Sequence, residues 1–353
     1  MGRCGHVLGA DRSEPLSRRA GPRAAAVAEA GGLGFLAAGY KTADGMYQEI
    51  KQLRALTGQP FGVNLFMPHP PLADLSAVEV YRHQLAGEAA WYETPLGDPD
   101  AGGDDGYEAK VAILLEDPVP VVSFTFGCPG REVLDAFAAA GTFTVVTVTS
   151  AQEARDAQWA GAHAVCAQGV EAGGHRSTHR DDPQGGLTGT GLLTLVAEVR
   201  ESVQLPVVAA GGLMRGSQIA AVLAAGAQAA QLGTAFLACP ESGAHRLHKQ
   251  ALTNPLFVTT ALTRAFSGRP ARGLVNRFVR EHGPYAPAAY PQVHQLTGGL
   301  RKAAARAGDA QGMALWAGQG HRMARELPAG ELVELLVAEM DAACAAVSGR
   351  STR

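Results

Sequence analysis

A polar residue, two adjacent glycines and a histidine follow one another closely in the middle of this chain. The stretch runs from Gln168 to His175 and includes Gly173 and Gly174, and it leaves a short apolar run, residues 162–167, that is typical of a buried strand. Adjacent glycines let the backbone lie close to a flat ligand, and histidine exchanges a proton near neutral pH. The stretch predicts an active-site loop; the alternative is a tight turn with a surface histidine.

Two later apolar runs also end in small or polar residues. The residues at these two ends are Gly211, Gly212, Gln231, Gly233 and Thr234. A helical pattern starts near Gly216, directly after the first pair. In barrels of parallel strands the loops after the last two strands form the usual phosphate site, because converging N–H groups and a helix N-terminus favour an anion. We therefore expect a nucleotide phosphate here; glycines that only turn the chain are the alternative.

Seven short apolar runs alternate with helical stretches and would position these loops. The predicted strands are residues 33–38, 61–65, 119–124, 143–148, 162–167, 206–210 and 227–232, and the helices are 23–30, 42–56, 131–140, 151–160, 191–203 and 217–225. Near-continuous apolar strands separated by helices indicate a parallel sheet covered by helices. Seven strands are one short of a (β/α)8 TIM barrel, so we predict this α/β fold with an atypical first strand.

Three segments lie outside the repeating pattern. Residues 1–22 form an atypical N-terminal segment, in which only Val7 and Leu8 could seed the missing strand. Residues 67–117 form an inserted helical segment after the third strand, with an amphipathic stretch over 74–91 and a second helix over 107–115. It is expected to act as a lid, because loops after barrel strands lie on the catalytic face. The barrel domain would span residues 23–240, and residues 241–353 would form a helical C-terminal extension packed on it.

Composition excludes several classes of protein. The 353 residues are 46% hydrophobic with a net charge of -3, and Lys and Arg form no long run, so we expect neither a nucleic-acid partner nor binding to a membrane surface. Five widely spaced cysteines give neither a zinc spacing nor a disulfide framework, which fits a cytoplasmic protein. No stretch approaches eighteen apolar residues, and the first thirty residues lack a signal-peptide pattern.

Other candidate residues carry weaker signals. Glu171, His175 and His179 recur at four-residue steps, but the two glycines between them would interrupt a helix, so no metal site is expected. The arginines at 264, 269, 272 and 277 form a basic cluster that either attracts an anionic substrate or is ordinary charged surface. His245 and His248 are expected to be solvated. We expect Trp316 to lie in the core, and Tyr285 and Tyr290 to pack near the mouth of the site.

Taken together, six motifs resemble the nitronate monooxygenases, formerly called 2-nitropropane dioxygenases. They are residues 61–66 (FGVNLF), 168–175 (QGVEAGGH), 209–212 (AAGG), 231–236 (QLGTAF), 267–272 (SGRPAR) and 316–319 (WAGQ). The likeness covers about residues 24–336, and the set is specific although each motif alone is not. It implies an FMN-dependent TIM-barrel enzyme that oxidises alkyl nitronates, or their parent nitroalkanes, with molecular oxygen and without a metal.

The resemblance also implies roles for individual residues. Asn64 and Gln168 would hydrogen-bond the flavin ring, and Gly173 would let the ring approach. The ribityl phosphate would be held by Gly211, Gly212, Gly233 and Thr234, with Gln231 beside them. His175 would be the catalytic base or the group that positions the nitronate, because an imidazole can take a proton from a carbon acid or donate a hydrogen bond to a nitronate oxygen.

The chain also departs from the family pattern. Members open with a first strand that ends in a Pro-Met pair touching the flavin, and no such pair precedes Arg23. We therefore expect residues 1–22 to be a misassigned start of the chain. Thr125 stands where some relatives have histidine, which would change substrate handling but not FMN binding.

Two other functions stay open at this point. An NAD(P)H-dependent flavin enoyl-ACP reductase shares the barrel and a similar Gly-Gly-His loop, although residues 61–66, 267–272 and 316–319 favour the monooxygenase. A degenerate, non-catalytic flavin-binding barrel would follow if the first strand has been lost. The sequence is compatible with a homodimer but does not fix the oligomeric state.

Overall fold

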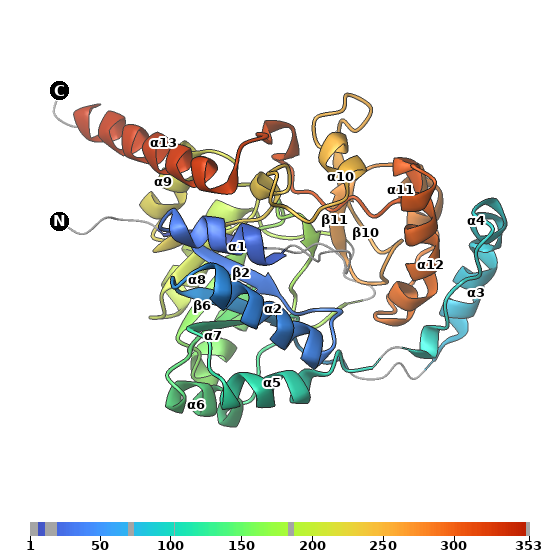
Figure 1. Ribbon diagram of the computed structural model, residues 1–353, viewed down its shortest axis with the longest axis horizontal. Helices are drawn as coiled ribbons and strands as arrows, with labels where there is room; N and C mark the ends of the chain where they lie inside the picture. Colours follow the sequence, from blue (N-terminus) through green and yellow to red (C-terminus); the bar gives the residue numbers. More distant parts are fainter. Residues whose placement is uncertain (1–5, 11–19, 70–73, 102, 183–186, 351–353) are drawn as a thin grey trace.

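A closed barrel of eight parallel strands forms the centre of the protein, as predicted (Figure 1). The computed structural model describes residues 6–10, 20–69, 74–101, 103–182 and 187–350. The strands lie in the order β1-β2-β3-β4-β5-β6-β8-β9. They are β1 (His6–Ala10), β2 (Leu33–Ala37), β3 (Phe61–Phe66), β4 (Val121–Thr125), β5 (Phe143–Val148), β6 (Ala164–Gln168), β8 (Val207–Ala210) and β9 (Ala229–Leu232).

The weakly predicted first strand closes the ring. Leu8 of β1 lies opposite Leu33 of β2 on one side and opposite Gln231 of β9 on the other. The Val7-Leu8 seed therefore lies inside a regular parallel strand. The rest of the segment expected to be atypical, residues 1–5 and 11–19, lies outside the described residues, and the first helix begins at Ala20.

Seven helices follow the strands and cover the outside of the barrel (Figure 1). They are α1 (Ala20–Glu29), α2 (Ala43–Leu56), α5 (Tyr107–Glu116), α6 (Arg131–Ala139), α7 (Ala151–Ala160), α8 (Leu192–Ser202) and α9 (Gly216–Ala224). Side-chain oxygens cap two of them: Thr42 accepts from the N–H of Gly45, and Ser150 accepts from that of Glu153. Their apolar faces bury residues such as Leu53 against the strands, and this burial positions the strand ends.

The inserted segment is helical, but its amphipathic stretch divides at Leu85 into α3 (Ser76–Gln84) and α4 (Ala86–Trp91); a short η1 (Pro99–Ala101) precedes α5. Both α3 and α4 lie beside the C-terminal helices, on the right of Figure 1, and not over the barrel wall. Val78 and Tyr81 share a buried cluster with Phe278, and the hydroxyl of Tyr81 donates to the carbonyl of Ala265 at 2.8 Å. The insertion is thus fixed to the C-terminal part of the chain.

The C-terminal part is not purely helical, which corrects the prediction. Its elements are η2 (Thr234–Phe236), α10 (Arg246–Ala251), β10 (Thr260–Thr263), β11 (Ala271–Leu274), α11 (Arg277–His282), η3 (Gly283–Tyr285), α12 (Gln292–Arg306), η4 (Ala310–Gly312), η5 (His321–Met323) and α13 (Ala329–Arg350). A second sheet runs β10-β11-β7, in which β7 is the pair Gly174–His175 and Ala271 lies opposite His175. The last part of the chain therefore holds the histidine loop in place. No helix in the described part of the chain is long and apolar enough to cross a membrane.

Candidate active site

One cavity, about 730 Å³ including its open mouth, lies where the carboxyl ends of β6, β8 and β9 meet. Seven of the eight residues expected to bind the cofactor line it: Gln168, Gly173, Gly211, Gly212, Gln231, Gly233 and Thr234. Three strand ends that are far apart in sequence thus converge on one space. The eighth residue, Asn64, lies on β3 and does not line this cavity.

Three glycine-bearing segments form the walls of the cavity, and they pack backbone to backbone. A Cβ on Gly173 would lie 2.4 Å from the nitrogen of Gly318. Gly211 and Gly212 have φ of 133° and 69°, and a Cβ on Gly212 would lie 3.0 Å from the Cβ of Glu171. Side chains are excluded at these positions by neighbouring protein atoms and by backbone conformation. The same absence of side chains leaves bare backbone facing the cavity.

The end of the cavity expected to bind phosphate differs in one respect from the prediction. The N–H groups of Met214 and Arg215 donate to the side chain of Gln218, and that of Gly216 donates to Glu339 of α13 at 2.8 Å. The N-terminus of α9 is therefore already capped by protein oxygens and does not offer these donors to an anion. Donors for a phosphate must come from the glycine turns themselves and from Thr234.

The hydroxyl group of Thr234 can donate a hydrogen bond. Its hydroxyl oxygen accepts the N–H of Gly318 at 2.9 Å, so its own proton is directed elsewhere. Thr234 opens η2, directly after the end of β9, and it lines the cavity together with Gly318 and Gly320. The sequence motif 316–319 belongs to this wall, although no binding role was predicted for it.

Asn64 and Gln168 are both held by hydrogen bonds within the protein. The amide oxygen of Asn64 accepts from the hydroxyls of Ser123 at 2.8 Å and Thr125 at 2.9 Å, both on the neighbouring strand β4. The amide of Gln168 donates to the carbonyl of His175 at 3.0 Å, and its oxygen accepts the N–H of Ser177 at 2.9 Å. Gln168 therefore fixes the histidine loop from inside, and Thr125 orients Asn64.

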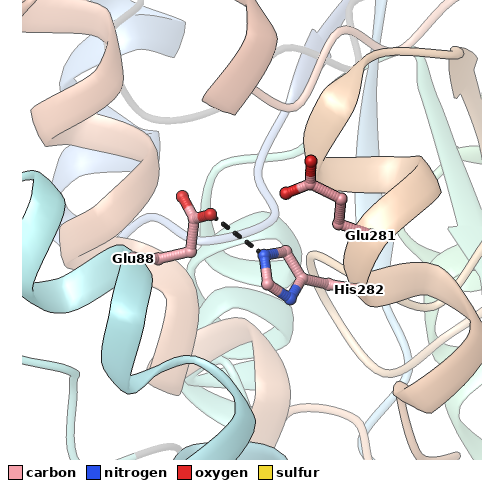
Figure 2. A group of neighbouring side chains, drawn as sticks. All are labelled: Glu88, Glu281 and His282. Carbon is pink, nitrogen blue, oxygen red and sulfur yellow. Dashed lines mark hydrogen bonds and ion pairs between the residues drawn. The ribbon is translucent and has the colours of Figure 1, made fainter.

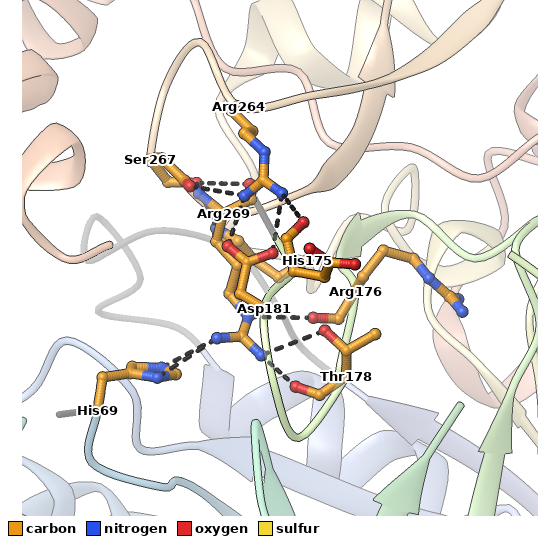
Figure 3. A network of polar contacts seen from close by, with 10 residues as sticks. His69, His175, Arg176, Thr178, Asp181, Arg264, Ser267 and Arg269 are labelled. Carbon is orange, nitrogen blue, oxygen red and sulfur yellow. Dashed lines mark hydrogen bonds and ion pairs between the residues drawn. The ribbon is translucent and has the colours of Figure 1, made fainter. Parts of the chain in front are cut away.

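His175 is nearly buried beside the cavity, one residue beyond Gly174, which lines it. Its ring lies 5.4 Å from the ring of Trp316, and Nε2 lies 2.9 Å from Oγ of Ser267. Ser267 Oγ also donates to the carbonyl of Arg269 at 3.2 Å, so its oxygen can accept a hydrogen bond from Nε2 of His175 (Figure 3). The histidine thus lies at the glycine-lined cavity in a defined orientation.

The four arginines expected to form a basic cluster each have separate partners. Arg264 pairs with Asp181, and Arg269 donates to the carbonyls of Arg176 and Thr178, so both tie down the loop after His175 (Figure 3). Arg272 donates to the carbonyl of Val170 at 2.8 Å, and Arg277 pairs with Glu88 on α4. Two of these arginines are thus paired with carboxylates, and the other two donate to backbone carbonyls.

His248 also corrects a prediction, because it is buried rather than solvated. Its Nε2 donates to the carbonyl of Trp316 at 2.9 Å, and both residues line the cavity. Burial lowers the pKa of His248 to about 4, so its ring is neutral at physiological pH. His245 is partly exposed and accepts the N–H of Leu247 at the start of α10, whereas Tyr285 is 63% exposed and not packed as expected. The charged sequence around His248 gave no indication of its contact with Trp316, which lies 68 positions later in the chain.

A separate acidic group lies between the insertion and the C-terminal helices. Glu88, Glu281 and His282 bring ligand-type atoms within 4.8 Å of one another (Figure 2). Arg277 already forms hydrogen bonds with both oxygens of Glu88 and with Glu281 at 2.8 Å. Although burial by itself raises the pKa of Glu88, the bonds with Arg277 and His282 lower it to about 2. This arginine-neutralised group joins α4 to α11.

The fold and the cavity together define a class. A closed parallel barrel with a glycine-walled cavity at the carboxyl ends of its strands is the architecture of barrel enzymes that bind a phosphorylated cofactor.

Comparison with known proteins gives the family. A sequence model of the family described as nitronate monooxygenase matches residues 19–339. The nitronate monooxygenase of Pseudomonas aeruginosa is 42% identical over 334 residues, which cover 90% of this chain and 92% of that protein. That of Paraburkholderia phytofirmans is 41% identical over 326 residues, covering 90% and 88%. The chain belongs to the nitronate monooxygenase family and is a flavin-dependent oxidoreductase.

Solved structures agree with this assignment. Nitroalkane oxidase from Streptomyces ansochromogenes is 69% identical, superposes with a TM-score of 0.94 and covers 97% of each chain. FabK from Thermotoga maritima is 28% identical with a TM-score of 0.74, covering 98% of this chain and 96% of its own. The likeness to the nitroalkane oxidase is therefore much the stronger.

Proposed function

We propose that this enzyme oxidises alkyl nitronates, and nitroalkanes after loss of a proton, with molecular oxygen and FMN. The observation that carries the proposal is that Gly173, Gly212 and Gly233 line one cavity while His175 lies at its edge. The proteins that this chain resembles are named for nitronates and nitroalkanes, which supports the substrate class.

The described residues fit a flavin mononucleotide. Gly211 and Gly212 have positive φ and leave bare backbone at one end of the cavity, and Thr234 has a hydroxyl proton to donate there. Together with Gly233 they would hold one terminal phosphate. Gln231 lines the same cavity from β9, opposite Ala210, so its amide would lie beside the ribityl chain. A cradle of this kind for one terminal phosphate favours the mononucleotide.

The ring end of the cavity has a different character. Gly173 and Gly174 provide backbone, while Trp316 provides apolar surface. Gln168 lines this end and would present amide groups to the polar edge of the ring, and Asn64 would approach from β3, with its orientation set by Ser123 and Thr125. The bound flavin supplies electron transfer and the reaction with oxygen.

His175 would handle the substrate. With its Nε2 2.9 Å from Oγ of Ser267, the imidazole is held in place and could accept the α-proton of a nitroalkane. A substrate that is already a nitronate needs no base, so the imidazole would then act by orienting it. The rings of Phe126 and Tyr290, at 5.6 Å and 6.0 Å from the ring of His175, would keep water away from this step.

The experiment is to identify the cofactor and the reductant. Heat-released flavin should have the mass of FMN in a stoichiometry near one per chain. Under anaerobic conditions, ethyl nitronate should bleach the flavin absorbance, whereas NADPH should bleach it far more slowly. Rapid bleaching by NADPH alone would support the NAD(P)H-dependent enoyl-ACP reductase instead, and purified protein that takes up no flavin would support the degenerate barrel.

A further inference from the structure

A second, wider space, about 1560 Å³ including its mouth, opens beside the cavity of the candidate active site. We call it the vestibule. Its walls come from the ends of β2 and β3, the turn before α5 and one face of α12; the residues used below are Tyr40, Phe66, His69, Tyr290, His294 and Gly298. None of the eight residues expected to bind the cofactor lines it.

Aromatic rings line the vestibule and lead to His175. The rings of Tyr40 and His294 are stacked, with centroids 4.1 Å apart and planes within 3° of parallel. On the vestibule side, the ring centroid of Tyr290 lies 4.9 Å from that of His69 and 6.3 Å from that of His294. It also lies 6.0 Å from the ring centroid of His175. Tyr290 is therefore shared by the vestibule and the reaction site.

Two rings beside this route are held in an unusual backbone conformation. Tyr40 and Phe126 have φ of 62° and 78°, a region that bulky residues rarely adopt. The N–H of Tyr40 donates to Asp105 at 2.8 Å, and Asp105 is in turn bound to Lys110 at 2.7 Å. Such strain persists where the surrounding structure enforces it, commonly at ligand sites. Here this backbone conformation directs the ring of Tyr40 into the vestibule.

The two histidines of the vestibule wall are uncharged. Burial lowers the pKa of both His69 and His294 to about 4, so both rings are neutral at pH 7. Lys41 is paired with Glu49 at 2.6 Å.

Charged side chains complete the lining: Arg301 is buried in it, and the buried guanidinium of Arg269 contacts the ring of His69. The guanidinium of Arg301 donates to the carbonyl of His294 at 2.9 Å. Lys302 and Asp104, which have opposite signs, are exposed at the mouth. The aromatic part of this surface, formed by Tyr40, Tyr290 and His294, suits an uncharged, flat group.

We propose that the vestibule binds the substituent of the substrate, and that it selects nitronates whose substituent is an uncharged aromatic ring. This rests on the proposed function: the nitronate group lies by His175, and its substituent passes Tyr290 to reach the stacked pair of Tyr40 and His294. The aromatic walls then offer stacked and edge-to-face contacts that a short alkyl chain cannot fill.

The test compares three nitronates with the wild-type enzyme: that of phenylnitromethane, that of nitroethane, and one of similar size that ends in a carboxylate. We expect kcat/KM for the phenyl compound to exceed that of ethyl nitronate by on the order of tenfold or more. The carboxylate compound should show no such gain. A greater gain for the carboxylate compound, or equal values for all three, would overturn the proposal. Failure to oxidise ethyl nitronate at all would instead contradict the proposed function.

A variant that fills part of the vestibule provides the second part of the test. Gly298 lies on α12 in the vestibule wall, and a Cβ there would have its nearest neighbour, Arg301 Nη2, at 3.7 Å, an ordinary contact. Gly298→Leu should therefore fold and occupy part of the vestibule, lowering the ratio of phenyl to ethyl kcat/KM about tenfold. Gly87→Leu on α4, where a Cβ meets nothing within 4 Å, should leave the ratio unchanged. A ratio that Gly298→Leu does not lower would contradict the assignment.

Discussion

Gly173 and Gly318 lie so close together that a Cβ on Gly173 would come within 2.4 Å of the backbone nitrogen of Gly318. Gly173 belongs to the loop after β6, and Gly318 belongs to the segment before α13, 145 positions later by their residue numbers. The next residue, Gln319, donates its N–H to the carbonyl of Glu171 at 3.0 Å. One wall of the cavity is therefore made by two distant segments that fit only without a side chain.

Gly173→Ala should weaken flavin binding by tenfold or more, because backbone atoms on both sides must move to admit the methyl group. Flavin dissociation constants measured by fluorescence would show this. Gly130→Ala is the matched control, since its φ is -62° and a Cβ there meets nothing within 4 Å. Equal flavin affinity in both variants would contradict the close packing described here.

The sequence alone predicted no effect of residue 125 on FMN binding, but the contact with Asn64 changes this expectation. Thr125→Val should weaken flavin binding about fivefold, because Asn64 would lose one of the two hydroxyls that orient its amide. The change conserves shape and leaves Ser123 in place, so the loss should be partial. Thr142→Val removes a hydroxyl that donates to Val119 at 2.9 Å elsewhere on the chain, and it should affect stability without changing flavin affinity. If the two variants bind flavin alike, Asn64 is not a flavin contact.

Ser267→Ala should lower kcat for nitroalkane oxidation about tenfold while flavin affinity stays unchanged, because His175 loses the hydrogen bond that fixes its Nε2. Ser267 acts through His175 and is a positioning residue. Stopped-flow measurement of flavin reduction separates this effect from binding. A change confined to flavin affinity would show that Ser267 serves the cavity and not the histidine.

The group formed by Glu88, Arg277 and His282 should make stability depend on acid pH. The pKa of Glu88 falls from the ordinary carboxyl range to about 2 on folding, so its stabilising effect is complete above that ordinary range and is lost as the pH falls toward 2. Glu88→Gln should therefore destabilise the protein by about 3 kcal/mol at pH 7. Thermal unfolding at pH 7 and pH 3 would show the difference shrinking in acid.

The control for this pair is a surface ion pair on the same insertion. Glu79 and Arg82 lie 3.3 Å apart, with side chains 52% and 35% exposed. Glu79→Gln should change stability by less than about 1 kcal/mol at either pH. If Glu88→Gln behaves in the same way, α4 is not held to α11 by this group.

The barrel was predictable from the sequence because its strands are short apolar runs bounded by glycine or proline. Phe143–Val148 has the predicted bounds, and most other strands differ by one or two residues. The glycine loops after β6, β8 and β9 were predictable for the same reason, since strand order alone brings their ends together.

What the sequence did not show depends on contacts between distant segments. Strands β10 and β11 have four residues each, and β11 contains Arg272 and Gly273, so neither has an apolar pattern of its own. They become strands by pairing with each other, and β11 also pairs with β7. The burial of His248 was not predicted because it comes from the segment around Trp316. The capped N-terminus of α9 was not predicted because Glu339 comes from α13.

The central claim is that His175 acts directly on the substrate at the edge of the flavin cavity. It is tested by oxygen consumption with nitroethane, using flavin-loaded wild type, His175→Asn and the matched variant His245→Asn, whose asparagine can still cap α10. We predict that His175→Asn lowers kcat/KM by on the order of a hundredfold or more while retaining its flavin, and that His245→Asn does not. A loss of only a few-fold in His175→Asn would contradict the account.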